Sequence, residues 1–269
     1  MSTEDQSKYT DLETYKMGAL LNAINDLDQS VAHAAHRAIP QIERFCSDTL
    51  LKMKKGGRLF YVGSGTSGRL GIVDASECPP TYGVDHGVVV GIIAGGDTAI
   101  RKAVEFAEDD TAACYKQLLE HGIHSNDTVV GISASGKTPY VLGAMNACKA
   151  NGISTGCIVC NSDSAIAAAS GFPMEVLTGP EFVRGSTRMK AGTGTKLALN
   201  MITTSLMIKL GHVKGNKMID MQLSNDKLVD RGTRMVMEET DLNYAAANDL
   251  LLKTKSVRAA VDAWIQSNK

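Results

Sequence analysis

Hydrophobic residues at the start of the chain recur at helical spacing. Apolar residues three and four positions apart share one helix face, so the pattern predicts one helix over 14–25 and a second over 30–55. Ser30 is a typical N-cap residue, and the Gly-Gly pair at 56–57 is a typical helix end. We expect Pro40 to kink or divide the second helix, because proline interrupts helical hydrogen bonding.

The pattern then changes to short runs rich in Val and Ile. The first four runs are each followed by a Gly- or Ser-rich turn and then by helical spacing, which predicts alternating β and α units that build a parallel sheet. Continuous apolar runs suit strands that are covered on both faces. The predicted strands are RLFYV (58–62), VVVGIIA (88–94), TVVGISA (128–134), STGCIVC (154–160) and PMEVLT (173–178).

The last third of the chain is predicted to be helical. A long helix is expected from Ser186 to Leu210, another over 225–239, and two short helices over 243–267. The predicted division of the chain is an N-terminal helical segment (1–55), an α/β domain that includes the long helix (56–223) and a small helical appendage (224–269).

Composition limits the classes of function. The formal charge is −1 with a pI near 6.6, which leaves no basic excess for nucleic acid or an anionic membrane. The longest apolar stretch, 88–94, is too short to span a membrane, and the polar N-terminus lacks a signal-peptide core. Six cysteines in 269 residues are too sparse for a disulfide framework. We therefore expect a cytoplasmic protein with reduced thiols.

No metal site is expected from the cysteines or histidines. Cys157 and Cys160 form a CxxC, but in a strand the two positions face opposite sides of the sheet. His33 and His36 are one helical turn apart and have no further ligand at a zinc spacing.

The loop after the first predicted strand, Gly63–Gly68, matches the dinucleotide-binding pattern GxGxxG before a helix. That function also needs an acidic residue at the end of the next strand to hold a ribose. The second strand instead ends in Ala94-Gly95-Gly96, and Asp97 is equally suited to capping the helix that follows. A dinucleotide site is therefore disfavoured.

The loop after the third predicted strand, 131–138, matches the P-loop pattern GxxxxGK[ST]. An NTPase also needs a carboxylate for magnesium at the end of a neighbouring strand. The neighbouring strands end in Val62-Gly63, Ala94-Gly95 and Cys160-Asn161, none of which is acidic. Nucleotide hydrolysis is therefore a minor alternative.

Both loops are rich in small hydroxyl residues beside a predicted helix N-terminus. Hydroxyls, backbone N–H groups and the positive helix end together suit a phosphate monoester. Helix capping alone explains one Ser or Thr in a loop but not three. The candidate phosphate-binding residues are Ser64, Gly65, Thr66 and Ser67 in one loop and Ser133, Ser135 and Thr138 in the other.

A third segment, 179–193, is predicted to open the long helix with Ser186 as its cap. Arg188 and Lys190 would then lie in the first turn, where the helix dipole disfavours cations. An anion nearby would reverse that penalty, so Lys190 is a candidate phosphate ligand. Extension of both side chains into water is the alternative.

Two glutamates are candidate acid–base groups. Glu77 is predicted near the C-terminus of the helix that starts at the first loop, just before Pro79-Pro80, which should end it. A carboxylate at that end of a helix is electrostatically unfavourable, which favours its protonated, proton-donating form. Glu108 belongs to a short acidic run after the next helix, and such a run is usually a solvated face.

Six ordered segments carry motifs that identify a family: GSGTSGRLG, DASECPPT, IAGGDTAIRKAVEFAEDD, ISASGKTPYV, GPEFVRGSTRMKAGT and KGNKMIDMQLSNDKLVDRG. Together they resemble the bacterial N-acetylmuramic acid 6-phosphate etherases of the sugar isomerase (SIS) superfamily. The resemblance begins at Thr3-Glu4 and includes the tail, which is similar to a small ubiquitin-associated-like bundle. Departures are a short segment after Thr3-Glu4, and Ser133 and Lys137 where Ala and Arg are commoner.

The resemblance implies a five-stranded parallel SIS sheet between helices, a homodimer, and neither a metal nor a redox cofactor. It implies cleavage of the ether between D-lactate and C3 of the sugar, giving N-acetylglucosamine 6-phosphate and D-lactate. By the same resemblance Glu77 donates a proton to the leaving lactate, and Glu108 is the second acid–base group. The sequence leaves open which of them removes the C2 proton. Two other functions are considered: a phosphosugar-responsive regulatory protein and an aldose–ketose phosphate isomerase.

Overall fold

The computed structural model describes residues 2–268. The chain divides into two compact units. One comprises the chain up to Ala75 together with Val89–Ile202, and the other comprises Ser76–Val88 together with the chain from Thr203 onward. Helices α3 (Gly65–Tyr82) and α8 (Lys190–Leu210) contribute residues to both units. The predicted division at residues 55 and 223 stays a prediction.

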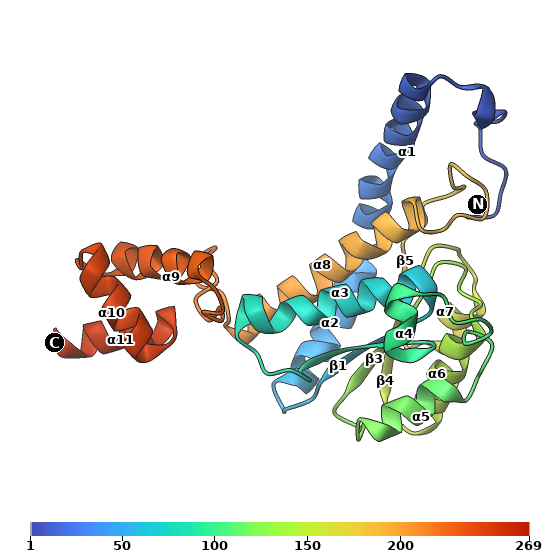
Figure 1. Cartoon of the computed structure of the whole chain (residues 1–269). Coiled ribbons are helices and arrows are strands. Elements are labelled where there is room, and N and C mark those ends of the chain that lie inside the picture. Colours follow the sequence, from blue (N-terminus) through green and yellow to red (C-terminus); the bar gives the residue numbers. More distant parts are fainter. Residues whose placement is uncertain (1, 269) are drawn as a thin grey trace. The chain divides into compact units, whose positions relative to one another are not determined.

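The first unit is built on a five-stranded sheet in the order β2-β1-β3-β4-β5. All four neighbouring pairs of strands are parallel, with Gly63 of β1 opposite Ile93 of β2 and Ile132 of β3. The carboxyl ends of the strands therefore meet at one edge (Figure 1). The strands are β1 (Leu59–Gly63), β2 (Val89–Ile93), β3 (Thr128–Ser133), β4 (Ser154–Val159) and β5 (Phe172–Glu175).

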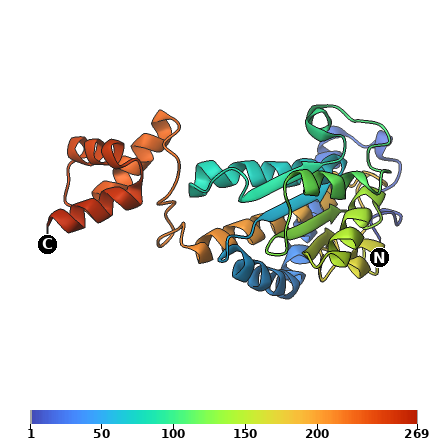
Figure 2. The same cartoon turned by 90° about the horizontal axis from the view of Figure 1, so that it is seen from below.

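Helices of this unit flank the sheet (Figures 1 and 2), as strands buried on both faces require. One apolar cluster packs α6 and α5 against β1, β3 and β4, with Phe60, Val129 and Met145 at its centre and no more than 1% exposed. The remaining elements are η1 (Leu12–Thr14), α1 (Met17–Arg37), α2 (Ile39–Met53), α4 (Gly96–Arg101), α5 (Ala113–Glu120), α6 (Pro139–Ala150) and α7 (Ala165–Ala169).

The second unit contains a three-helix bundle of α9 (Asp226–Glu239), α10 (Tyr244–Thr254) and α11 (Val257–Ser267). The side chains of Asn225, Asn243 and Ser256 cap these helices by accepting the N–H group three residues on. The bundle has its own apolar core, formed by Ile219, Met221, Val236, Ala247, Leu251, Val257, Ala260 and Val261.

The predicted parallel sheet, its five strands and the three C-terminal helices are confirmed. The predicted boundaries within the first 55 residues were wrong. Helix α1 continues through 26–29, and Ser30 is not an N-cap but lies inside α1, where its hydroxyl donates to the Leu27 carbonyl. The predicted division near Pro40 is confirmed: the chain breaks at Ala38, and Pro40 lies in the first turn of α2, where its missing N–H group costs no hydrogen bond.

Two further helix ends differ from the prediction. Pro79 and Pro80 do not end α3, which continues to Tyr82. The last turn is stabilised by distant groups, because Gln222 N–H bonds the Pro80 carbonyl and the buried Tyr82 donates to Thr204. Helix α8 begins at Lys190, four residues after the predicted cap at Ser186.

Candidate active site

The loops after β1 and β3 lie side by side, because these two strands are neighbours in the parallel sheet. Ser64, Thr66 and Ser67 are each half-buried at the start of α3. A Cβ atom added to Gly192 of α8 would lie 3.6 Å from the Thr66 methyl carbon, so the first turn of α8 borders the same loop. The structure thus brings together the first predicted loop and the end of the third segment.

Hydroxyl groups of the second loop lie close to one another. The buried Ser133 Oγ lies 2.8 Å from Thr138 Oγ1 and 3.4 Å from Ser135 Oγ, and it accepts the Gly136 N–H. Ser133 therefore shapes the loop from within. Ser135 and Thr138 are half-buried and retain hydrogen-bonding capacity for a ligand.

Glu108 meets the first hydroxyl loop. The Ser64 hydroxyl donates a 2.9 Å hydrogen bond to Glu108 Oε2. The two residues line a pocket of about 220 Å³ together with Gly65, Arg69, Ala94 and Phe106, among others. Glu108 is exposed, and it lies in the turns that follow α4. The sequence alone predicts that Glu108 lies on a solvated face, but in the structure its side chain lines a cavity.

The turn at Gly95 allows this pocket to form. Gly95 has φ +85°, and a Cβ atom there would come within 2.8 Å of Val104. Glycine is therefore needed for the segment after α4 to fold back over the turn. Phe106 also has positive φ, at +59°, and is 81% exposed. A bulky residue in this conformation is strained, and such strain concentrates at functional sites.

Glu77 is not in the last turn of α3, so the predicted electrostatic reason for its protonated form does not hold: the helix continues for five residues beyond it. Glu77 is exposed and lies twelve residues after Gly65 on the same helix. At a rise of 1.5 Å per residue, these Cα atoms are about 18 Å apart along the helix axis. Glu77 is not among the described residues that line the pocket at the start of α3.

Lys190 has a partner that the sequence did not suggest. The buried Glu181 carboxylate accepts the N–H groups of Lys190 and Ala191, at 2.9 Å each, and so caps α8. Burial raises the pKa of Glu181, against the effect of these bonds and of Lys190. Burial lowers the pKa of Lys190, whose ammonium donates to the Pro180 carbonyl. An anion near the first turn is thus supplied by the chain itself.

Asn161 and Thr3 are additional residues at this edge of the sheet. Asn161 follows β4, and its side chain accepts the Thr3 N–H at 2.8 Å and donates to the Thr3 hydroxyl and the Ser135 carbonyl. Thr3 is fully buried. Asn161 thus ties the N-terminal segment to the second hydroxyl loop. Its position directly after a strand is the one signal in the sequence that could have indicated this role.

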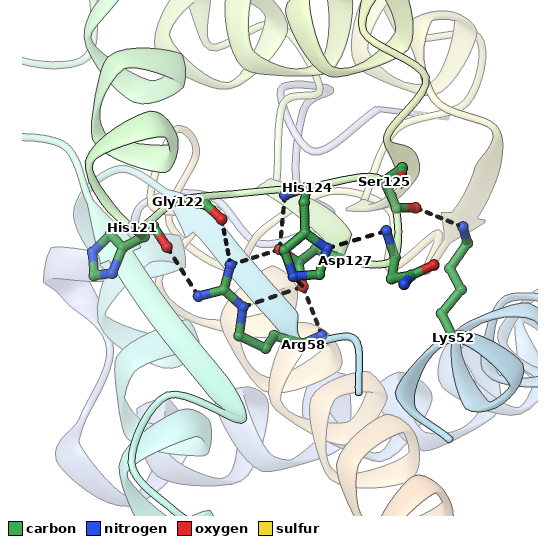
Figure 3. Close-up of polar contacts among 8 residues, drawn as sticks. Lys52, Arg58, His121, Gly122, His124, Ser125 and Asp127 are labelled. Atoms are coloured by element: carbon green, nitrogen blue, oxygen red, sulfur yellow. Dashed lines mark hydrogen bonds and ion pairs between the residues drawn. The ribbon is translucent and has the colours of Figure 1, made fainter. Parts of the chain in front are cut away.

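A second polar cluster lies at the opposite edge of the sheet, before β1 and β3. Asp127, which precedes β3, accepts hydrogen bonds from the Arg58 side chain and from the N–H groups of Arg58 and His124 (Figure 3). Burial opposes ionisation of Asp127, but these bonds outweigh burial and hold its pKa below the ordinary value. Arg58 also donates to the carbonyls of His121 and Gly122. Asp127 and Arg58 bond each other and backbone groups of the same chain. The cluster therefore stabilises the fold and is not a candidate site.

The glycine pattern of the first loop has a packing reason. A Cβ atom on Gly68 would lie 2.5 Å from Ile93 and 2.8 Å from the Gly63 carbonyl oxygen. Glycine at this position therefore allows α3 to pack closely against β1 and β2. Packing alone accounts for this glycine, so it is not evidence for a dinucleotide site. Among residues 2–268 no group of three His, Cys, Asp or Glu side chains could hold a metal. Within the same range, no helix has the length and apolarity to cross a bilayer.

Comparison with known proteins defines the class and then the family. Residues 41–149 match the model of the glucokinase regulatory protein N-terminal SIS domain. The structure resembles phosphoheptose isomerase from Neisseria gonorrhoeae with a TM-score of 0.52 at 17% identity, covering 71% of this chain and 98% of that chain. The fold is therefore that of SIS proteins, as the sequence predicted.

Sequence relatives identify the family. The chain is 58% identical over 261 residues to an N-acetylmuramic acid 6-phosphate etherase of Christiangramia forsetii, covering 97% of this chain and 95% of the relative. It is 56% identical over 262 residues to an etherase of the same name from Bacteroides fragilis, covering 97% and 93%. The chain belongs to the N-acetylmuramic acid 6-phosphate etherase family, whose members are carbon–oxygen lyases.

Proposed function

We propose that this protein cleaves the D-lactyl ether of N-acetylmuramic acid 6-phosphate, giving N-acetylglucosamine 6-phosphate and D-lactate in the recycling of cell-wall sugar. The observation that carries the proposal is the Ser64–Glu108 contact: Glu108, the proposed acid–base group, lies in a pocket lined also by the first hydroxyl loop. The proposed location is the cytoplasm, which suits the six free cysteines.

The two loops form the phosphate site of this proposal. Hydroxyls of Thr66 and Ser67 at the start of α3, and of Ser135 and Thr138 before α6, are half-buried at the carboxyl edge of the sheet. This edge is where open α/β sheets bind ligands. Backbone N–H groups at the two helix starts add positive potential for the 6-phosphate. Lys190, at the start of α8, has the buried Glu181 carboxylate as its counter-charge, so we assign it to the start of that helix and not to the phosphate.

The reaction requires two proton-transfer groups. In the open-chain sugar the C1 aldehyde acidifies the C2 proton, and a base removes it. The C3–O bond then breaks, and its electron pair leaves with the lactate oxygen, which takes a proton from an acid. Water next adds across the double bond, with hydroxyl at C3 and a proton returned to C2. We assign the base to Glu108 and the acid to Glu77.

The active form in this proposal is a homodimer. Glu77 lies twelve residues beyond Gly65 on α3, about 18 Å along the helix axis, and this separation supports a site shared between two subunits. Glu77 of the partner subunit would complete the pocket. The exposed side chains of Val104 and Phe106 at the pocket rim support this arrangement, since such apolar surface is typical of protein interfaces.

Release of D-lactate tests the proposal. Purified protein incubated with N-acetylmuramic acid 6-phosphate should release D-lactate without added metal, nucleotide or NAD, and EDTA should leave the rate unchanged. Conversion of an aldose phosphate to a ketose phosphate without lactate release would favour an isomerase. Tight binding of the sugar phosphate without turnover would favour a regulatory protein.

A further inference from the structure

Among residues 2–268, Arg69 is the one cationic side chain in the lining of the Ser64–Glu108 pocket. It lies on α3 one turn after Gly65, which also lines the pocket, so the two positions share a helix face. Glu105 and Glu108 are the other charged residues of the lining. A guanidinium in this position offsets their repulsion of an anionic ligand.

The Arg69 guanidinium is held in a defined orientation. Its Nε–H donates a 2.9 Å hydrogen bond to the Ile100 carbonyl near the end of α4. Arginine has five N–H donors in one plane, so this bond fixes the plane and leaves the two terminal amino groups for other acceptors. Two parallel N–H donors match the two oxygens of a carboxylate.

The remainder of the lining is apolar, and most of it is alanine. Alanines at 94, 99, 103 and 107 line the pocket around the guanidinium. Such a wall leaves room for a short, branched organic acid with its methyl group against alanine and its carboxylate on arginine. The two hydroxyl loops, by contrast, present donors suited to a phosphate.

We propose that Arg69 binds the carboxylate of the D-lactyl group and thereby selects etherase substrates over sugar phosphates that lack this group. The inference rests on the proposed function, because that function supplies a ligand with two anions. The phosphate occupies the hydroxyl loops, and the lactyl carboxylate occupies the alanine-lined pocket. Arg69 thus positions the leaving group beside Glu108.

The test compares the substrate with its own product, since N-acetylglucosamine 6-phosphate has the same sugar and phosphate but no lactyl carboxylate. Arg69→Gln should raise the KM for N-acetylmuramic acid 6-phosphate about 10- to 100-fold, the effect of losing hydrogen bonds to a charged group. The inhibition constant of the product should change less than about twofold, because it never contacts Arg69. Arg101→Gln, an exposed arginine on the last residue of α4, is the matched control and should change neither value.

A substrate analogue with a lactyl carboxamide sharpens the comparison. The parental protein should bind this analogue more weakly than the acid, and Arg69→Gln should bind both alike. An equal loss of affinity for substrate and product would show that Arg69 only maintains the structure of the pocket, and this result would overturn the proposal. Unchanged affinity for both would also overturn it.

Calorimetric binding keeps this test separate from the proposed reaction. If the parental protein binds the substrate more tightly than the product but releases no D-lactate, the proposed function fails. The proposed role of Arg69 in binding the lactyl carboxylate would still be supported if Arg69→Gln abolished that difference in affinity. This role would be excluded if the difference persisted.

Discussion

The Ser64 hydroxyl donates a hydrogen bond to the Glu108 carboxylate, and this bond links the loop after β1 to the segment after α4. The bond fixes the position of the Glu108 carboxylate in the pocket. A second oxygen of Glu108 remains available to take a proton from a ligand. This relationship makes Glu108 the better candidate for the base and leaves the acid to Glu77.

Glu108→Gln should abolish exchange of the substrate C2 proton with deuterated solvent. General acid–base catalysis contributes about 10²–10⁴-fold, so lactate release should fall by a similar factor. Glu77→Gln should lose lactate release to a similar extent but retain some exchange, because the base is intact. Proton NMR in D₂O measures both. Asp109→Asn, next to Glu108 and outside the pocket lining, is the control. Full exchange by Glu108→Gln would exclude Glu108 as the base.

Mixing two inactive variants should restore activity if Glu77 acts across the dimer. Subunit exchange between Glu77→Gln and Glu108→Gln gives mixed dimers in which one of two sites has both glutamates. Random mixing in a twofold dimer then predicts about a quarter of the parental number of sites. Glu77→Gln mixed with the double variant has no complete site and should stay inactive. No recovery in the first mixture, with subunit exchange verified, would place both glutamates in one chain.

The two glutamates illustrate what the sequence could predict. Short apolar runs predicted the strands, and the reason holds best for β1, β3 and β4, because continuous apolar runs identify strands buried on both faces. The continuation of α3 through Pro79-Pro80 could not be predicted, since it depends on Thr204 and Gln222, which are distant in sequence. The position of Glu77 in the helix was wrong for the same reason.

Contacts between distant residues also limited prediction of the site. Motifs identified the hydroxyl loops because each loop is a local sequence feature. The capping of α8 by Glu181 involves residues nine and ten positions apart with an irregular loop between them. The bonds between Thr3 and Asn161 span 158 positions. No local pattern indicates either contact, because each depends on how the chain folds back on itself.

Ser135→Ala should raise KM and leave kcat nearly unchanged, because ground state and transition state hold the same phosphate. Loss of one hydrogen bond to a charged group costs about 1.5–3 kcal/mol. Asn161→Ala should raise KM less than Ser135→Ala does, since the Asn161 side chain donates to the Ser135 carbonyl and does not bind the phosphate. Steady-state kinetics measure both. Asn151→Ala removes a comparable bond at the end of α6 and should have no effect on KM. An unchanged KM for Ser135→Ala would remove its hydroxyl from the phosphate site.

Asp127→Asn should destabilise the protein in a pH-dependent manner. The carboxylate side chain is fully buried, and Arg58 and two backbone N–H groups bond it, which holds its pKa below the ordinary value of 3.8. A group with a lowered folded-state pKa contributes stability above its unfolded-state pKa, and this contribution is lost as the pH falls through the folded-state value. Replacement should therefore cost about 2–3 kcal/mol at pH 7, as for a hydrogen-bonded charged group.

The difference in stability between the parental protein and Asp127→Asn should stay constant between about pH 7 and pH 5, because the carboxylate is ionised in both folded and unfolded chains. It should narrow only below about pH 4, where the unfolded chain takes up a proton that the folded chain still excludes. Urea unfolding at several pH values measures this difference. Asp26→Asn, exposed on α1, controls for the loss of one negative charge. An equal cost at pH 7 and pH 3 would show that Asp127 acts through shape and hydrogen bonding alone, and not through its charge.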